Sequence, residues 1–361
     1  MKTKIKIALF FGGKVTKHLG MIKAAAKKLG VQLDLISYNR VYFETESGKV
    51  GIRNSIKNYE LRITNYKSLD DYDVLFFRTT GKHWEEVNLI VDSAKQNIKE
   101  GRAVVVYPLV LKGRPSDACK AWQMMELQKA GIPVPKTIYG SLWWLYKTME
   151  SKSLKLLKLG LGFPVILKGS GGDPPSQELR RAGRGTGELQ FPVILKGSGG
   201  DRGTRVFRAK NLKQLERLVR KLRKTEIEEG KRYMLQEFVE NEGDYRVLVL
   251  GKRVLGVMKR SRQKRGEFRN NFSLGGKVEV VNLPEKVKVM AVKAAEVCGL
   301  WVAGVDVIYK SKVKSQKSES NGEYMVLEVN KGPQFKGFMQ ATGIDVPREI
   351  VKYLVSLKIK N

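Results

Sequence analysis

The chain has 361 residues, of which 42% are hydrophobic and 29% are charged, as expected for a globular protein of two or three structural domains. No apolar run approaches the roughly 20 residues that would span a bilayer, so we expect no membrane association. The two cysteines, Cys119 and Cys298, are too few for a disulfide framework or a zinc site, which favours a reducing compartment and hence the cytoplasm.

Lysine and arginine outnumber aspartate and glutamate by 68 to 36, which gives a formal net charge of +32. Such an excess favours polyanionic surroundings, such as nucleic acid, the ribosome or an acidic peptide. The basic residues are, however, spread along the whole chain, and no recognisable nucleic-acid-binding motif accompanies them. Binding to nucleic acid or to the ribosome therefore stays open as the less favoured interpretation.

Residues 1–110 alternate between strand-like and helix-like segments, which predicts an N-terminal α/β domain of the βαβ type. The strands are expected at 4–11, 31–38, 73–80 and 103–109, and the helices at 21–30 and 85–101. Gly12 and Gly13 follow the first strand, but the G-x-G-x-x-G pattern of a dinucleotide site is missing.

A second unit is predicted to begin near Asp117, and we divide the rest of the chain into a central segment, 111–232, and a C-terminal segment, 233–361. Helices are expected at 117–131, 142–162, 212–224, 284–300 and 349–358, and strands at 191–196 and 205–209. Residues 245–260 read as a hairpin with Gly251 and Lys252 at its turn, and residues 310–323 as a polar loop.

The stretch FPVILKGSGGD occurs twice, at 163–173 and at 191–201, and its eleven residues are identical in the two copies. Copies within a fold repeat diverge, so this identity indicates a recent insertion or duplication over 163–190, or an assembly error. Only the second copy runs directly into a loop and a further strand, and we therefore predict that the second copy is the working one.

Two apolar runs near the C-terminus each contain oxygen ligands suited to a metal ion. GVDVIY (304–309) contains Asp306, and YMVLEVN (324–330) contains Glu328 and Asn330, which project to the same side of a strand. A carboxylate in such a strand is costly to bury unless a cation or a hydrogen-bond network compensates it. Two carboxylates and an amide, without nearby His or Cys, suit Mg²⁺. Salt-bridged structural carboxylates are the alternative.

A lysine leads into a glycine-rich turn in VILKGSGGD, where Lys196 precedes Gly199 and Gly200. Glycines let backbone N–H groups approach an anion and the ammonium neutralises it, so this turn is a candidate phosphate-binding loop. Farther along, the extended segment 233–246 offers backbone groups at 236–239 for an adenine edge, Asp244 for a ribose and Arg246 for phosphate oxygens. An edge strand with an acidic turn is the structural alternative for this segment.

Several motifs follow one another in a consistent order from about Asp117 to the C-terminus. They are ACK (118–120), IPVPKT (132–137), ILK (194–196), LQEFVENEGDYRVLVLG (235–251), KR (259–260), GEFRNNFSLGG (266–276), AGVDV (303–307), LEVN (327–330) and TGIDV (342–346). In this order and spacing the chain resembles the ATP-grasp superfamily, and most closely its RimK-like carboxylate–amine ligases.

The resemblance implies an N-terminal domain followed by a two-lobed α+β ATP-grasp domain, with ATP and Mg²⁺ or Mn²⁺ as cofactors. For ATP, the resemblance implies phosphate binding by Lys120, Lys196, Gly199 and Gly200, adenine binding by Gln236, Glu237, Phe238 and Val239, and ribose binding by Asp244. It implies that phosphate or acyl phosphate is stabilised by Arg246, Arg260, Arg269 and Asn271. It implies that the metal is bound by Asp306, Glu328 and Asn330. In such a reaction the protein positions the substrates and neutralises the phosphate charge, and it needs no nucleophilic side chain of its own.

From the resemblance we expect an ADP-forming ligase that joins an amino acid, with glutamate as the first candidate, to the carboxylate of a peptide, protein or small metabolite. A homo-oligomer and an acidic acceptor are expected. After LEVN the family commonly continues Ala-Ser-Pro-Gly, whereas this chain has KGPQ (331–334), which leaves the acceptor open. The alternatives are a lysine-biosynthesis-type ligase acting on an acidic carrier protein, a cofactor glutamate ligase, or a degenerate ATP-binding protein associated with the ribosome or RNA.

Overall fold

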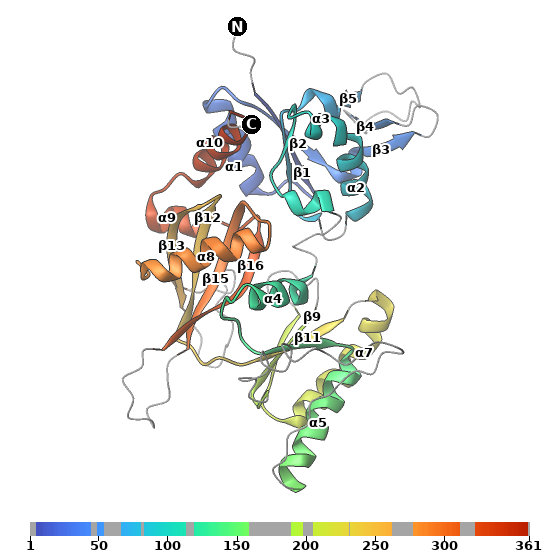
Figure 1. Ribbon diagram of the computed structural model, residues 1–361, viewed down its shortest axis with the longest axis vertical. Helices are drawn as coiled ribbons and strands as arrows, with labels where there is room; N and C mark the ends of the chain where they lie inside the picture. Colours follow the sequence, from blue (N-terminus) through green and yellow to red (C-terminus); the bar gives the residue numbers. More distant parts are fainter. Residues whose placement is uncertain are drawn as a thin grey trace, which may run out of the picture. The chain divides into compact units, whose positions relative to one another are not determined.

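The computed structural model describes residues 5–44, 49–53, 66–80, 83–112, 119–158, 189–197, 205–230, 232–261, 277–310 and 322–359. The chain divides into two compact units (Figure 1). The large unit comprises residues 1–134 and 240–361, and the small unit comprises residues 135–239. The three-domain division drawn from the sequence, with boundaries at 110 and 232, stays a prediction.

The N-terminal part of the large unit is a parallel sheet with the strand order β2-β1-β6-β7, which confirms the predicted βαβ pattern. Its strands are β1 (Lys6–Phe11), β2 (Gln32–Ser37), β6 (Val74–Phe77) and β7 (Val104–Val105). The helices are α1 (Lys17–Lys28), α2 (Trp84–Ser93) and α3 (Lys95–Lys99). Strands in parallel sheets are buried on both faces, and β1 and β6 are accordingly almost entirely apolar.

Three predicted elements of this part are shorter than expected, and the first is the strand predicted over 73–80, of which only Val74–Phe77 forms β6. The helix predicted over 85–101 divides at Ala94 into α2 and α3, and the buried side chain of Asn97 donates a hydrogen bond to Asp70. The strand predicted over 103–109 ends after Val105, and a 3-10 helix runs over Pro108–Lys112, because proline cannot donate a ladder hydrogen bond.

The sequence interpretation missed a second small sheet in the N-terminal part. Its strands are antiparallel and pair in the order β3-β4-β5, with β3 at Val41–Glu44, β4 at Lys49–Arg53 and β5 at Tyr66–Ser68. The strands are short and mixed in polarity, so they give little of the alternation that identifies a strand from sequence.

The C-terminal part of the large unit is an antiparallel sheet with the order β14-β13-β12-β15-β16. Its strands are β12 (Gly243–Leu250), β13 (Arg253–Ser261), β14 (Lys277–Val280), β15 (Val302–Lys310) and β16 (Glu323–Lys331). The predicted hairpin is confirmed, and Gly251 at its turn has a φ of +58°, which glycine adopts without strain. Helix α8 (Glu285–Val297) packs along β12, β15 and β16 (Figure 1).

Cross-strand pairing gives this sheet two different faces. Val247, Val305 and Val329 pair in one row across β12, β15 and β16, and all three are buried in the hydrophobic core. The next row is Arg246, Asp306 and Glu328, which alternation places on the opposite face. One face of the sheet therefore carries the row of valines, and the opposite face carries the row of charged side chains.

Three further helices lie in the described part of the large unit. Helix α4 (Lys120–Lys129) begins after Cys119 and packs on β16, α9 (Lys336–Thr342) packs on β13 and β14, and α10 (Val346–Ile359) packs against α1. Because α10 is the last helix of the chain, its contact with α1 joins the two ends of the sequence within one unit.

In the residues that the structure describes, the small unit is an antiparallel sheet with the order β10-β9-β11-β8 and two helices packed on each other. The strands are β8 (Thr137–Gly140), β9 (Val193–Gly197), β10 (Val206–Ala209) and β11 (Tyr233–Glu237), and the helices are α5 (Leu142–Lys158) and α7 (Leu212–Glu229). Its core contains Leu145, Leu195, Val219 and Leu235, all with no exposed surface. Strand β9 is the second copy of the repeat, and the first copy lies outside the described residues.

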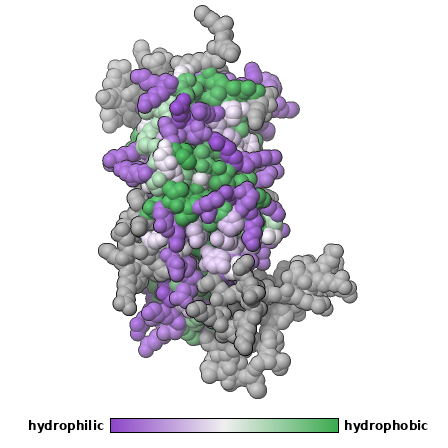
Figure 2. Space-filling model, turned by 90° about the vertical axis from the view of Figure 1, so that its left-hand side faces the viewer, coloured by the Kyte–Doolittle hydropathy of each residue, from purple (hydrophilic) through white to green (hydrophobic). Residues whose placement is uncertain are grey.

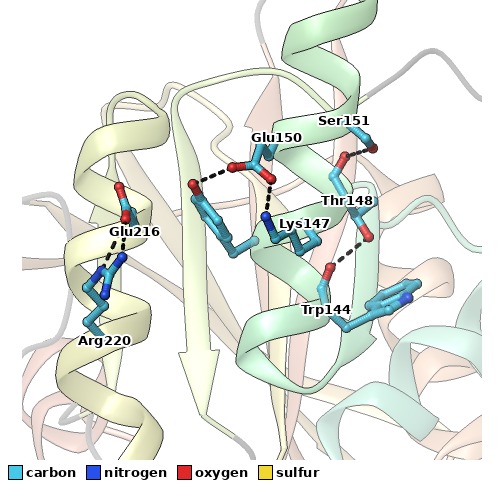
Figure 3. Close-up of polar contacts among 8 residues, drawn as sticks. Trp144, Lys147, Thr148, Glu150, Ser151, Glu216 and Arg220 are labelled. Carbon is cyan, nitrogen blue, oxygen red and sulfur yellow. Dashed lines mark hydrogen bonds and ion pairs between the residues drawn. The ribbon is translucent and has the colours of Figure 1, made fainter.

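Polar side chains of α5 and α7 pair locally along their helices, as Figure 3 shows. Lys147 and Tyr146 both bond Glu150 on α5, and Arg220 bonds Glu216 on α7. The buried carboxylate of Glu226 instead accepts the backbone N–H of Leu142 at 2.9 Å, which satisfies one donor at the start of α5. This contact ties the two helices at one end.

Across the described part of the chain, the structure contains no helix with the length and apolar character needed to cross a membrane. Hydrophilic side chains lie on all parts of the face drawn in Figure 2 where atoms are coloured, with hydrophobic areas between them.

Candidate active site

Two arginines hold Asp306 on the charged face of the C-terminal sheet. Arg246 donates from Nε to Oδ1 and from Nη2 to Oδ2, both at 2.8 Å, and Arg260 Nη2 lies 3.0 Å from Oδ2. Arg260 also donates from Nε to Asp244 Oδ1 at 2.5 Å. Two arginines thus neutralise two carboxylates on neighbouring strands, and three of these four residues, Asp244, Arg260 and Asp306, are buried.

Burial and charge act in opposite directions on these carboxylates. Burial favours a raised pKa for Asp306, but Arg246 and Arg260 outweigh it and hold the pKa of this carboxyl well below its usual range. For Asp244 burial dominates, Arg260 opposes it, and the nearby charge of Asp306 adds to it, so its pKa rises to about 6. Asp306 is therefore the carboxylate that stays ionised in this cluster.

The predicted metal ligands lie on neighbouring positions of the same face. Asn330 Nδ2 donates to Asp306 Oδ2 at 3.2 Å, and Glu328 pairs with Asp306 across β15 and β16. Lys120, in the first turn of α4, forms an ion pair with Glu328 Oε1 at 2.9 Å. The structure thus brings Lys120, Asp306, Glu328 and Asn330 together from three elements far apart in the sequence.

The ligand types of this cluster fit a hard divalent cation. Two carboxylates and one amide provide only oxygen ligands, which suits Mg²⁺ better than the softer transition metals. The described residues contain no group of three or more His, Cys, Asp and Glu side chains arranged to hold a metal. A cation at Asp306, Glu328 and Asn330 would therefore have further coordination positions for water or substrate oxygens. The same residues also form salt bridges, the alternative that the sequence left open.

In the small unit, Lys196 is held by a polar pair that the sequence interpretation did not predict. Its Nζ donates to Gln236 Oε1 at 2.6 Å, and Gln236 Nε2 donates to Thr137 Oγ1 at 3.0 Å. Lys196 and Gln236 lie on the adjacent strands β9 and β11. Alternation along β11 was the available signal, because it predicts that Gln236 faces away from the row of Tyr233 and Leu235.

The segment 236–239, predicted to contact adenine, has part of its backbone engaged within the small unit. Glu237 N–H donates to Lys136 O at 2.8 Å, and Phe238 N–H donates to Pro192 O at 3.3 Å. The Phe238 ring lies 3.9 Å from the guanidinium carbon of Arg208, and Val239 is buried. Four of the predicted residues, Gly199, Gly200, Arg269 and Asn271, lie outside the described residues.

Another buried cation, Arg78, was not identified from the sequence. It follows β6 directly, and its Nη2 donates to the backbone carbonyl of Gly332 at 2.7 Å. An arginine that ends an apolar strand was the only sequence signal, and such residues are common at strand ends.

The sequence of this chain is similar to a family model and to curated proteins of one kind. Residues 184–354 match the family model of the RimK-like ATP-grasp domain. The chain is 41% identical over 123 residues to a probable alpha-L-glutamate ligase of Syntrophotalea carbinolica, an alignment that covers 34% of this chain and 37% of that protein. It is 30% identical over 244 residues to a probable alpha-L-glutamate ligase of Cellvibrio japonicus, covering 67% of this chain and 64% of the relative. The chain thus matches less than two thirds of the length of these curated relatives.

The fold is similar to solved ATP-grasp ligases over nearly the whole chain. The ATP-grasp ligase PsnB, solved with its minimal precursor, Mg and ADP, superposes with a TM-score of 0.57 at 16% sequence identity, and the alignment covers 98% of each chain. This similarity confirms the expected mixed α/β architecture.

Proposed function

We propose that this chain, whose residues 184–354 match the family model of the RimK-like ATP-grasp domain, is an ADP-forming ligase that joins a carboxylate to the amine of an amino acid. A carboxylate oxygen of the acceptor attacks the γ-phosphorus of ATP and ADP leaves, which forms an acyl phosphate. The amine then attacks the acyl carbon, phosphate leaves with the electron pair of the broken C–O bond, and the amine loses a proton. The observation that carries the proposal is the line of Arg246, Asp306 and Glu328, with Asn330, on one sheet face.

We assign metal binding to Asp306, Glu328 and Asn330, which would hold Mg²⁺ or Mn²⁺, and the cation would neutralise phosphate charge during the transfer. The presence of Mg and ADP in the solved PsnB complex supports this cofactor pair. Lys120 is within ion-pair distance of Glu328, so its ammonium is placed to move from that carboxylate to a nucleotide phosphate.

Arg246 and Arg260 supply positive charge where a phosphoryl group would be transferred. Both guanidinium groups are fixed by hydrogen bonds to Asp306, so they need little reorganisation during the reaction. Arg269 and Asn271 are proposed to act with them. In this arrangement the protein positions and neutralises the reactants and supplies no nucleophile of its own.

The small unit is proposed to bind other parts of ATP. Lys196, held by Gln236, would neutralise phosphate oxygens together with the backbone of Gly199 and Gly200. The segment 236–239 would contact adenine, and ribose binding is proposed for Asp244. The family match begins at residue 184, so it contains Lys196 of the second repeat copy and excludes Lys168 of the first, which supports the second copy as the working one.

Glutamate is the proposed amino acid, since the curated relatives are named probable alpha-L-glutamate ligases. The acceptor is proposed to be an acidic peptide or protein, which the net charge of +32 would attract electrostatically. The related fold of PsnB has been solved in complex with a precursor peptide, which supports an acceptor of this kind. We further propose a cytoplasmic homo-oligomer.

The test is ADP release by the purified full-length protein in the presence of ATP, Mg²⁺ and a panel of amino acids, with and without a short glutamate peptide as acceptor. We expect release that requires both an amino acid and Mg²⁺, and mass spectrometry of the product should show one added residue. The matched pair of variants is Glu328→Gln in the proposed metal site and Glu323→Gln on the exposed end of the same strand. Release that is equal in the two variants would contradict the proposed site.

A further inference from the structure

Arg78 is a buried cation without a carboxylate partner among the described residues. Its exposed fraction is 9%, and its Nη2 donates a hydrogen bond to the backbone carbonyl of Gly332 at 2.7 Å. The buried Nη1 atom has no hydrogen-bond partner in the described part of the chain. Burial lowers the pKa of this guanidinium, as expected where a charge is poorly solvated. A buried charge left in this state is costly, so the position calls for an anion.

The surroundings of Arg78 are themselves electropositive. His18 Nε2 is buried without a partner among the residues that the structure describes, and burial, Arg78 and Lys336 together lower the pKa of this imidazole. Lys331 Nζ lies 3.1 Å from Thr80 Oγ1 and 4.6 Å from the centre of the Tyr107 ring. The end of β6, the end of β16 and the start of α9 thus contribute the positive charges of Arg78, Lys331 and Lys336, beside the neutral imidazole of His18.

Gly332 is the residue that lets the guanidinium approach the backbone. It has a φ of +70°, and a Cβ atom there would lie 2.6 Å from Arg78 Nη2. Any larger residue at this position would displace the arginine and strain the backbone. The sequence KGPQ, in which this chain departs from the pattern common in the family, is therefore the segment that receives Arg78.

The same segment reaches the charged face of the C-terminal sheet. A Cβ atom at Gly304, the cross-strand neighbour of Asn330, would lie 2.7 Å from Pro333 Cβ and 3.6 Å from Arg246 Cδ. Gly332 follows Asn330 by two positions in the chain, which is at most about 7 Å of extended backbone. The backbone carbonyl that Arg78 contacts is therefore two residues along the chain from Asn330, one of the proposed metal ligands.

We propose that Arg78 and Lys331 form a binding site for a substrate carboxylate, with Arg78 Nη1 and Lys331 Nζ as its donors. The inference rests on the proposed function, because the ligase reaction brings carboxylates to this part of the fold. A guanidinium is suited to a planar carboxylate, and the ammonium of Lys331 adds a second charge. The carboxylate comes either from the amino acid or from the acceptor, and the two sources share this chemistry.

Binding measurements on the full-length protein with MgADP separate the two sources. The probes are L-glutamate for the amino acid and an N-acetylated triglutamate peptide with an amidated C-terminus for the acceptor, each titrated by calorimetry. The variants are Arg78→Gln and Lys331→Gln, and Lys17→Gln on the exposed first turn of α1 is the control. Loss of a hydrogen bond to a charged group predicts a Kd about 10 to 100 times higher for one probe in both variants, and no change in Lys17→Gln.

An unchanged Kd for both probes in folded Arg78→Gln would overturn the inference, and so would a wild-type protein that binds inorganic phosphate but neither probe. If Arg78→Gln does not fold, Lys331→Gln decides by the same criterion. If the proposed function is wrong, the wild-type protein will show no amino-acid-dependent ADP release, which is a different measurement from probe binding. Selective loss of probe binding would then still establish a carboxylate site.

Discussion

Arg246 binds Asp306 with two parallel hydrogen bonds, and this pair joins the two central strands of the C-terminal sheet at the proposed metal site. The geometry is bidentate, and Arg260 contacts the same carboxylate from the next strand, β13. Because both guanidinium groups lie beside Asp306, this carboxyl stays ionised despite its burial.

The first prediction separates the role of Glu328 in function from its role in stability. Its ion pair with Lys120 is partly exposed, with exposed side-chain fractions of 30% and 21%, and such pairs contribute about 0–1 kcal/mol to stability. We therefore expect Glu328→Gln to change the melting temperature by only a few degrees at most, while Mg²⁺-dependent ADP formation falls by about 100-fold or more. Calorimetric melting and an ADP assay measure the two effects. Wild-type ADP formation in the variant would remove Glu328 from the metal site.

The second prediction concerns Arg260, which neutralises two buried carboxylates. Arg260→Met leaves Asp244 without its charged partner and Asp306 with only one, and loss of one partner from a buried ion pair costs about 3–5 kcal/mol. The control is Lys259→Met at the adjacent position, whose contact with Glu279 is 3.9 Å long and partly exposed, and we expect a cost of less than about 1 kcal/mol. Urea denaturation measures both. Equal losses of stability would show that the Arg260 network contributes no more than a surface pair.

The third prediction is a pH dependence that originates from Asp244. Burial raises its pKa to about 6, so the folded protein holds this proton at pH values where the unfolded chain, with the ordinary pKa near 3.8, has released it. The contribution of Asp244 to the unfolding free energy is therefore greatest below about pH 4 and is lost as the pH rises through about 6. Asp306 acts in the opposite direction, but its lowered pKa moves its effect to more acidic conditions.

Asp244→Asn should consequently remove a fall in stability between pH 4 and 7 that the wild-type protein shows. The measurement is the unfolding free energy in urea at several pH values, with EDTA present so that metal binding does not contribute. The same pH profile in wild-type and variant proteins would show that Asp244 titrates normally in the folded state.

The fourth prediction concerns the repeated stretch. Deletion of 163–190 removes one repeat unit and leaves the residues of β9 in place, so we expect the shortened protein to be at least as stable because the connection between α5 and β9 has fewer residues. In the full-length protein, Lys196→Ala should weaken ATP binding far more than Lys168→Ala, because Lys196 is held in the sheet by Gln236. ATP titration measures both affinities. The reverse order would identify the first copy as the working strand.

The fifth prediction uses the two thiols. Cys298 has no exposed surface, and burial raises its pKa to about 12, so it should react very slowly with a thiol reagent at pH 8. Cys119 is partly exposed at the start of α4, next to Lys120, and should react faster. We expect one fast thiol, which Cys119→Ser abolishes and MgATP protects. A fast reaction that persists in Cys119→Ser would contradict the burial of Cys298.

The local elements and the type of fold follow from the sequence alone. Continuous apolar runs identify β1 and β6, and the turn at Gly251 identifies the hairpin of β12 and β13. The carboxylates of β15 and β16 also stand out, because few charged residues occur within such apolar strands. The motif order then leads to the ATP-grasp family, and the family model and solved ligases agree with it. Each of these signals is read from short stretches of the chain and from their order, and none of them requires knowledge of which residues meet in space.

The pairing of those residues is decided only by the tertiary structure. Arg246 and Glu328 become neighbours of Asp306 through strand register, and a shift by one residue would turn each side chain to the other face. Lys196 is fixed by Gln236, forty residues away, and Arg78 meets Gly332 across 254 residues. No local pattern encodes such contacts. They arise because the whole unit must bury its apolar faces at the same time. The charged groups that are brought together in this way either neutralise one another or are available to bind a ligand.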